Sequence, residues 1–297
     1  MRIVILCIVL LVGCRSYGQG YIGYKYVSAS TLKDEWDNEY GSGNMQVVSG
    51  AYTFPLSVKR NEAGQLSKWS VSLSGTYATL SNDGQASGLN PPDILNGSLN
   101  LSYLCPLSRR WSLAASIGGG IYAPSDDISF KSILGNGGIL FIYRFSDTFL
   151  GGLGAGVSNS YGVPMAMPMF YLSWQTTGRW AFKIDLSNTL CMAVSVRPVK
   201  KMSIELAALE VDGMSAVVNV QGKDKIYSCA MLSSSLYASL QVAKGLSLYG
   251  GFGGNWVRAI KLTDRSLKGF TDGFKDEHDG KEYRPALRVV AGIKYGF

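Results

Sequence analysis

Apolar and small polar side chains alternate with a period of two along most of this sequence. Between residues 68 and 80, one side carries Trp69, Val71, Leu73, Gly75 and Tyr77, and the other carries Ser70, Ser72, Ser74, Thr76 and Ala78. Residues 95–105 and 111–118 repeat the pattern. Successive side chains of a β-strand point to opposite faces, so the alternation predicts strands that each have one apolar face.

The polar face of these strands is almost free of charge. A soluble β-sandwich would place Lys, Glu and Arg on its wet face, yet charged residues make up only 16% of this chain, against about 25% in a typical globular protein. The apolar faces begin or end in Trp or Tyr, as in strands that cross a hydrocarbon layer between aromatic girdles. The pattern favours a membrane-spanning sheet over the alternative, a soluble glycine-rich β-protein.

Fourteen segments fit this description. They lie at 20–30, 45–57, 68–80, 95–106, 111–123, 137–146, 148–158, 166–176, 179–187, 190–197, 201–212, 226–241, 246–261 and 286–297. Bacterial single-chain barrels have an even number of strands. We therefore predict an all-β, transmembrane, antiparallel up-and-down β-barrel of about 14 strands, with 12 as the alternative because the pair at 179–197 is short. A barrel of this width should be too wide for side chains alone to fill.

Connections between the segments alternate between short and long. Short ones lie at 107–110, 146–147, 176–178, 198–200 and 243–245, and long ones at 31–44, 81–94, 124–136, 159–165, 213–225 and 262–285. Basic residues gather at the short connections and acidic residues at the long ones. Outer-membrane barrels have short periplasmic turns and long outer loops, so we expect the short connections to face the periplasm.

The first residues read as an export signal. The run from Ile3 to Gly13 follows a basic start and is too short to span a membrane as a helix, which needs about 20 residues. We predict a signal peptide at 1–18 and a barrel domain at 19–297. An alternative is a lipoprotein acylated at Cys14. Both readings send the chain out of the cytoplasm, and we expect it in the outer membrane of a Gram-negative bacterium.

The chain stops on an apolar strand. Leu287, Val289, Ala291, Ile293, Tyr295 and Phe297 form one face of it. Such an edge is a hazard in a soluble protein, whereas in a barrel the last strand pairs with the first. Gly292, Tyr295 and Phe297 resemble the C-terminal β-signal of outer-membrane barrels, although Val290 stands where that pattern has a polar residue. The resemblance implies the barrel-assembly machinery and outer-membrane lipid as partners.

A wider resemblance covers the whole mature chain. Residues 168–174, Arg179-Trp180, Arg197-Pro198 and Ile204-Glu205-Leu206 make the sequence similar to uncharacterised outer-membrane barrels grouped as domains of unknown function. That resemblance implies a barrel fold and brings no substrate with it.

Residues suited to catalysis or metal binding are scarce. His278, the only histidine, lies among acids in the connection 262–285 and reads as a solvated residue. Cys105, Cys191 and Cys229 lack the spacing of a zinc site. The basic residues form no stripe or motif for nucleic acid. We expect neither an enzyme nor a cofactor, and no nucleic-acid partner.

Two functions remain open. In the first, the barrel is a passive channel or transporter for a small or hydrophobic solute. The strand registers then place a set of charged side chains in the lumen: Lys183, Asp185, Glu205, Glu210, Arg288 and Lys294. In the second, the barrel is a surface-exposed binding or structural protein that acts through its outer loops. Its aromatic anchors would be Trp36, Tyr40, Phe270 and Phe274.

Overall fold

The computed structural model describes residues 18–296 except 63, 159–164, 177, 187–189, 267 and 269–279. Its strands are β1 (Gln19–Lys33), β2 (Glu39–Arg60), β3 (Leu66–Asn82), β4 (Asp93–Pro106), β5 (Trp111–Ala123), β6 (Ile133–Arg144), β7 (Phe149–Ser158), β8 (Met165–Gln175), β9 (Trp180–Leu186), β10 (Leu190–Val199), β11 (Met202–Val220), β12 (Lys223–Ala243), β13 (Leu246–Asp264), β14 (Lys281–Tyr283) and β15 (Ala286–Tyr295). Two short helical segments, α2 (Ala86–Leu89) and η1 (Phe130–Ser132), lie in the connections after β3 and β5.

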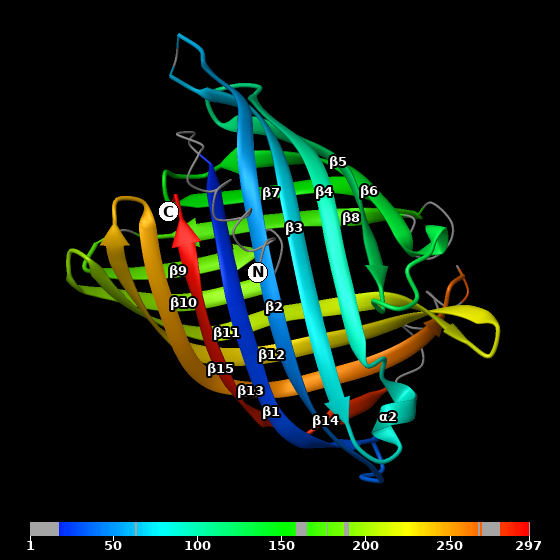
Figure 1. The fold of residues 1–297 in the computed structure, drawn as a ribbon. Coiled ribbons are helices and arrows are strands. Elements are labelled where there is room, and N and C mark those ends of the chain that lie inside the picture. The colour runs from blue at the N-terminus through cyan, green and yellow to red at the C-terminus, as the bar shows by residue number, and fades with distance from the viewer. Residues whose placement is uncertain are drawn as a thin grey trace.

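The strands form one closed antiparallel sheet (Figure 1). Each strand from β1 to β13 pairs with the next along the chain, and β15 pairs with both β13 and β1. The short β14 also lies between β13 and β1, so β14 and β15 are two parts of one strand. The predicted fourteen-strand barrel is confirmed, and with it the pairing of the last strand with the first.

Two predicted long loops are wrong. At 31–44, β1 continues to Lys33 and β2 begins at Glu39, so only residues 34–38 join the two strands. Residues 213–225 are not an irregular connection, because β11 continues to Val220 and β12 starts at Lys223. Only Gln221 and Gly222 join the two strands, with φ of 53° and 79°. Positive φ at both central residues is typical of the tight turns that join β-hairpins. The charged residues at 223–225 follow this turn and begin a strand.

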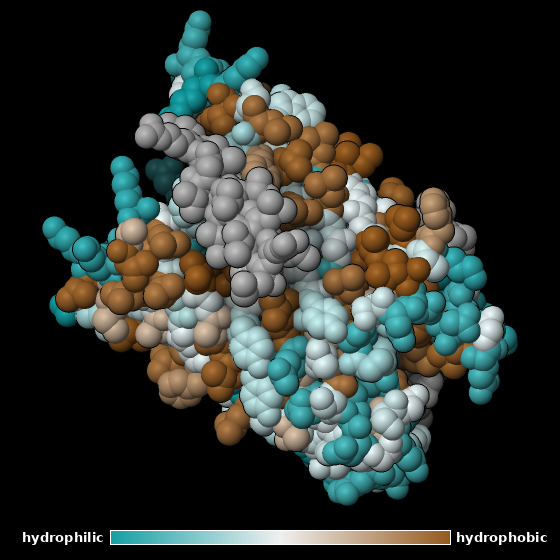
Figure 2. Space-filling model, viewed as in Figure 1, coloured by the Kyte–Doolittle hydropathy of each residue, from teal (hydrophilic) through white to brown (hydrophobic). Residues whose placement is uncertain are grey.

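The outer surface of the barrel is apolar along the middle of its strands. Six outward side chains from six strands are 55–73% exposed: Leu73, Leu99, Ile117, Leu153, Phe252 and Leu287. Figure 2 shows hydrophobic residues over the middle of the visible strands and hydrophilic residues at their ends. An apolar band between polar rims is the surface that a lipid bilayer requires of a barrel. No helix of the described residues is long and apolar enough to cross a membrane.

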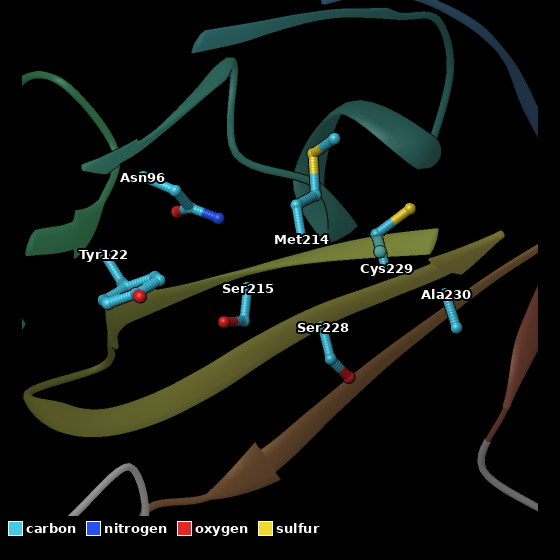
Figure 3. A pocket seen from close by; sticks show the side chains of 8 residues that line it. Asn96, Tyr122, Met214, Ser215, Ser228, Cys229 and Ala230 are labelled. Atoms are coloured by element: carbon cyan, nitrogen blue, oxygen red, sulfur yellow. The ribbon is translucent and has the colours of Figure 1, made fainter. Parts of the chain in front are cut away.

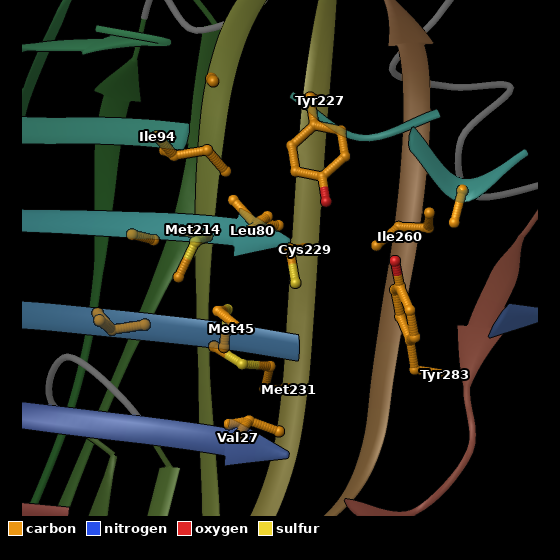
Figure 4. Packing of buried hydrophobic residues seen from close by; sticks show 14 of the residues in the cluster. Val27, Met45, Leu80, Ile94, Met214, Tyr227, Cys229, Met231, Ile260 and Tyr283 are labelled. Atoms are coloured by element: carbon orange, nitrogen blue, oxygen red, sulfur yellow. The ribbon is translucent and has the colours of Figure 1, made fainter. Parts of the chain in front are cut away.

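The core lies inside the barrel, near its long-connection end. Val27, Met45, Leu80 and Ile94 extend inward from β1, β2, β3 and β4 and are at most 6% exposed. They meet a second set from β11–β14, namely Met214, Tyr227, Cys229, Met231, Ile260 and Tyr283 (Figure 4). The expectation that side chains cannot fill a barrel of this width is therefore wrong at this end, because two opposite walls lie in direct contact.

Candidate functional site

The wall of the barrel is low between β8 and β11. β9 has only seven residues and pairs with β8 from Leu172 to Gln175 alone. The pairing of β10 with β11 ends at Val211. Seven residues of a strand tilted at about 40° rise about 18 Å, against an apolar band of about 25 Å. Among the described residues, the part of β11 beyond Val211 therefore has no strand partner on the β10 side, at a height where the wall would face hydrocarbon.

This part of β11 and its hairpin partner β12 lean into the barrel. β11 contacts β4, β5 and η1 on the opposite wall. Figure 3 shows Met214 and Cys229 on one face of the hairpin, with Ser228 and Ala230 directed to the other. An unpaired strand edge cannot face lipid, because its backbone groups would lose their hydrogen bonds. Inside the barrel, the edge is instead covered by protein.

Polar contacts fasten the hairpin to the connection between β5 and β6. The Lys131 Nζ lies 2.9 Å from the Asp224 carboxylate, and Arg265 donates to the Lys131 carbonyl over 2.6 Å. Asn96, in the orientation that satisfies both of its amide atoms, donates to the Ser215 carbonyl over 2.7 Å. The hairpin thus has apolar contacts with β1–β4, a polar contact with Asn96 of β4, and an ion pair to Lys131 near its tip.

A cavity of about 940 Å³ occupies the other half of the interior, toward the short turns. Its inner end is apolar, because Val47, Met214 and Met231 of the core also line the cavity. Its outer end is basic, with Lys200 and Lys201 at the turn after β10. Drug-sized ligand sites have about 300–1,000 Å³, so this cavity has room for a small molecule.

Ion pairs in the middle of the cavity join strands that are not neighbours in the sheet. Lys25 of β1 pairs with Asp212 of β11. Arg288 of β15 donates to the Glu210 carboxylate of β11 over 2.6 Å, and Tyr237 of β12 donates to the same carboxylate over 3.0 Å. The Arg288 side chain is only 4% exposed. These bonds hold β11 toward β1 and β15 below the apolar core.

The family comparison matches nearly the whole chain. Residues 15–296 fit the model of a family described as "Domain of unknown function (DUF6268)". The chain belongs to this family. A comparison with curated proteins finds no match.

Solved structures similar to this DUF6268 protein are outer-membrane barrels with different activities. An outer membrane channel from Pseudomonas putida F1 has 8% identity and a TM-score of 0.46, over 95% of this chain and 97% of the other. The Pseudomonas putida toluene transporter TodX has 8% identity and a TM-score of 0.35, over 97% and 92%. The outer membrane protease OmpT from Escherichia coli has 10% identity and a TM-score of 0.27, over 94% and 96%.

In this DUF6268 protein, the charged residues assigned to the lumen from sequence lie on inward-facing positions of their strands. Lys183 and Asp185 lie 3.7 Å apart on β9, and Glu205, Glu210, Arg288 and Lys294 line the cavity.

The cavity is also lined by five charged residues that were not predicted from sequence: Lys25, Asp212, Arg197, Lys200 and Lys201. Lys25 lies between two tyrosines of an alternating strand, and this position could have identified it as a lumen residue. Asp212 shares the face of Glu210 by its spacing of two, so alternation could have identified it as a lumen residue. Its partner Lys25, 187 residues away, could not be identified in this way.

The predicted loop anchors divide between described and undescribed residues. Trp36 is 66% exposed at the turn between β1 and β2. Tyr40 packs against the interior core and donates to the Asp34 carboxylate over 3.0 Å. Phe270, Phe274 and His278 lie outside the described residues, as do Phe297 and residues 1–17.

The two described residues of the predicted β-signal lie in the strand that closes the barrel. Gly292 pairs with Gly23 of β1, and Tyr295 pairs with Gly20. A Cβ at Gly292 would collide with the Ile22 carbonyl and the Tyr249 ring, so glycine is required for this close approach. Within the described part of the chain, no group of His, Cys, Asp or Glu side chains could hold a metal ion.

Proposed function

We propose that this protein is an outer-membrane barrel that gives a small solute passive passage, with the 940 Å³ cavity as its periplasmic vestibule. The observation that carries the proposal is the enclosure of a polar, ion-paired cavity by a barrel whose exterior is apolar. A structural barrel would gain nothing from such a cavity, since unfilled interior space weakens packing. The outer-membrane lipid contacts the apolar band, and export precedes insertion.

The termini and turns support this orientation. Gln19 donates to the Gly296 carbonyl over 3.0 Å, so both described ends of the chain lie together. They lie at the end with the short turns, where Gly245 accepts a hydrogen bond from the Gly296 amide. Short turns face the periplasm in bacterial barrels, and the cavity mouth at Lys200 and Lys201 then faces the periplasm as well.

The β11–β12 hairpin is the constriction on the outer side of this path. Its inward face makes the apolar contact with β1–β4, and passage depends on how much space this contact leaves. A barrel with a shortened hairpin should conduct more ions per channel. Gly213 and Ala230 are directly paired, so an Asn-Gly turn can replace residues 214–229 between them.

Planar-bilayer recording tests the proposal. Wild-type protein should give discrete conductance steps, and the shortened hairpin should give larger steps. Trp36→Ala, an exposed change at the outer turn, is the matched control and should leave the step size unchanged. Silent bilayers for both the wild type and the shortened variant, each shown to be folded by heat-modifiable gel migration, would reject the channel function.

The alternative of binding through outer loops has less support. It relies on four aromatic anchors, of which the structure describes two. Tyr40 is engaged by the core and by Asp34, which leaves Trp36 as the described aromatic side chain at that turn with a largely exposed surface. An enzymatic role has no supporting cluster in the described interior, and we propose none.

A further inference from the structure

The cavity carries an excess of positive charge. Seven basic side chains line it, namely Lys25, Lys183, Arg197, Lys200, Lys201, Arg288 and Lys294, and three acidic ones, namely Glu205, Glu210 and Asp212. A concave site lined by one sign of charge and walled by low-dielectric protein concentrates counter-ions of the opposite sign. The lining alone therefore favours anions.

The basic side chains that are not paired with a carboxylate lie together on one side of the cavity. Lys25, Lys183 and Arg288 are each paired with a carboxylate. Within the described residues, Arg197, Lys200, Lys201 and Lys294 have no carboxylate at salt-bridge distance. They come from β10, the turn after it and β15, and all line the mouth.

The inner end of the cavity has the opposite character. Val47, Met214 and Met231 line it, and each is at most 7% exposed. Val290 of β15, 8% exposed, extends this apolar surface toward Arg288. A molecule that enters from the mouth thus meets free cations first, then the ion-paired layer, and finally a sulfur-rich apolar surface. Methionine side chains adapt to ligands of irregular shape.

We propose that the cavity binds small amphipathic organic anions, with the carboxylate among Lys200, Lys201, Lys294 and Arg197 and the apolar body toward Val47, Met214 and Met231. This inference rests on the proposed function for its biological meaning, since such anions would be the solutes that the barrel admits. The binding itself needs no conduction, which allows the two ideas to be tested apart.

Isothermal titration of the folded, detergent-solubilised protein tests the binding. The probes are benzoate, benzyl alcohol and benzylamine, which share a ring and differ in charge. Benzoate should bind at least about tenfold more tightly than benzyl alcohol, the gain from one charge-assisted hydrogen bond, and benzylamine should bind most weakly. Raising the salt concentration should weaken benzoate alone, because screening acts on the charge. Equal binding of the three probes would overturn the proposal.

Charge removal at the mouth locates the site. The variant K200Q/K201Q/K294Q should lose about tenfold in benzoate affinity and keep its affinity for benzyl alcohol. K59Q/R60Q is the matched control, because these exposed cations lie at the same end of the barrel and do not line the cavity. An equal loss of benzoate affinity in both variants would show that benzoate is attracted to the positive charge of this end in general, and it would overturn the proposed site.

Bilayer recording separates the inference from the channel function. Benzoate binding with silent bilayers would support the site and reject passage. Conductance steps without benzoate binding would support passage and reject the site. If both hold, a salt gradient should give a reversal potential of anion selectivity, reduced in K200Q/K201Q/K294Q and unchanged in K59Q/R60Q.

Discussion

The ion pair between Arg288 and Glu210 should stabilise the barrel, because it joins two strands that are not neighbours in the sheet. Arg288 lies on β15 and Glu210 on β11, with β12 and β13 between them in the sheet. The guanidinium also donates to the Ser235 hydroxyl over 3.1 Å. Arg288→Met keeps much of the side-chain length and removes both bonds. Among the described residues, Glu210 would then keep Tyr237 as its hydrogen-bond partner.

The loss of stability can be bounded from this geometry. Removing one partner of a buried ion pair costs about 3–5 kcal/mol when the other charge is left isolated. Glu210 is 21% exposed to the cavity and keeps the Tyr237 hydroxyl, so we expect the lower end, about 3 kcal/mol. Glu210→Gln in the same protein removes the isolated charge. The double variant should therefore be more stable than Arg288→Met alone, by about 1–2 kcal/mol.

Urea unfolding from phospholipid vesicles, followed by tryptophan fluorescence, measures these differences. Lys294→Met is the control, because Lys294 is inward on the same strand and contacts the Tyr249 ring without a carboxylate partner within the described residues. It should cost less than about 1 kcal/mol. A double variant that loses as much as the two single variants together would refute the coupling between Arg288 and Glu210.

Three further changes test other parts of the structure. Tyr283→Phe should cost about 1–2 kcal/mol in urea unfolding, because the hydroxyl bonds two asparagine side chains inside the core. Gly253→Ala should destabilise the barrel, since a Cβ there would collide with the backbone of β12, whereas Gly97→Ala meets open space and should be neutral. Hydrogen bonding from Lys33 lowers the pKa of Asp37. Ionised Asp37 should therefore protect the turn between β1 and β2 from hydrogen exchange above about pH 4. This protection should be lost as the pH falls through the lowered pKa of Asp37. Hydrogen exchange of that turn in wild type and Asp37→Asn would show it, with the acid-induced change absent from the variant.

The strands could be predicted because alternation is local. Trp111 and Ile117, for example, share a face by spacing alone, and β5 has the predicted bounds, 111–123. Lumen positions such as Arg288 also follow from this parity. The partners across the lumen could not be predicted, since Lys25 and Asp212 are brought together by barrel closure rather than by sequence distance. The hairpin at Gln221 was missed because its charged residues resemble a loop.

A difference in strand length explains why the outer half of this barrel is narrower than the inner half. A lumen stays open when every strand has neighbours of equal height, because all backbone groups are then paired within the wall. Among the described residues, β9 extends to Leu186 and β10 pairs with β11 only as far as Val211, so beyond Val211 β11 is paired with β12 on one side and has no strand partner on the other. Hydrocarbon cannot satisfy that edge, and the opposite wall can. The inward lean brings Met214 onto the core and narrows the outer half, while the base of β11, still paired with β10, leaves room for the cavity beneath. The shortness of β9 and β10 thus gives rise to both the constriction and the vestibule.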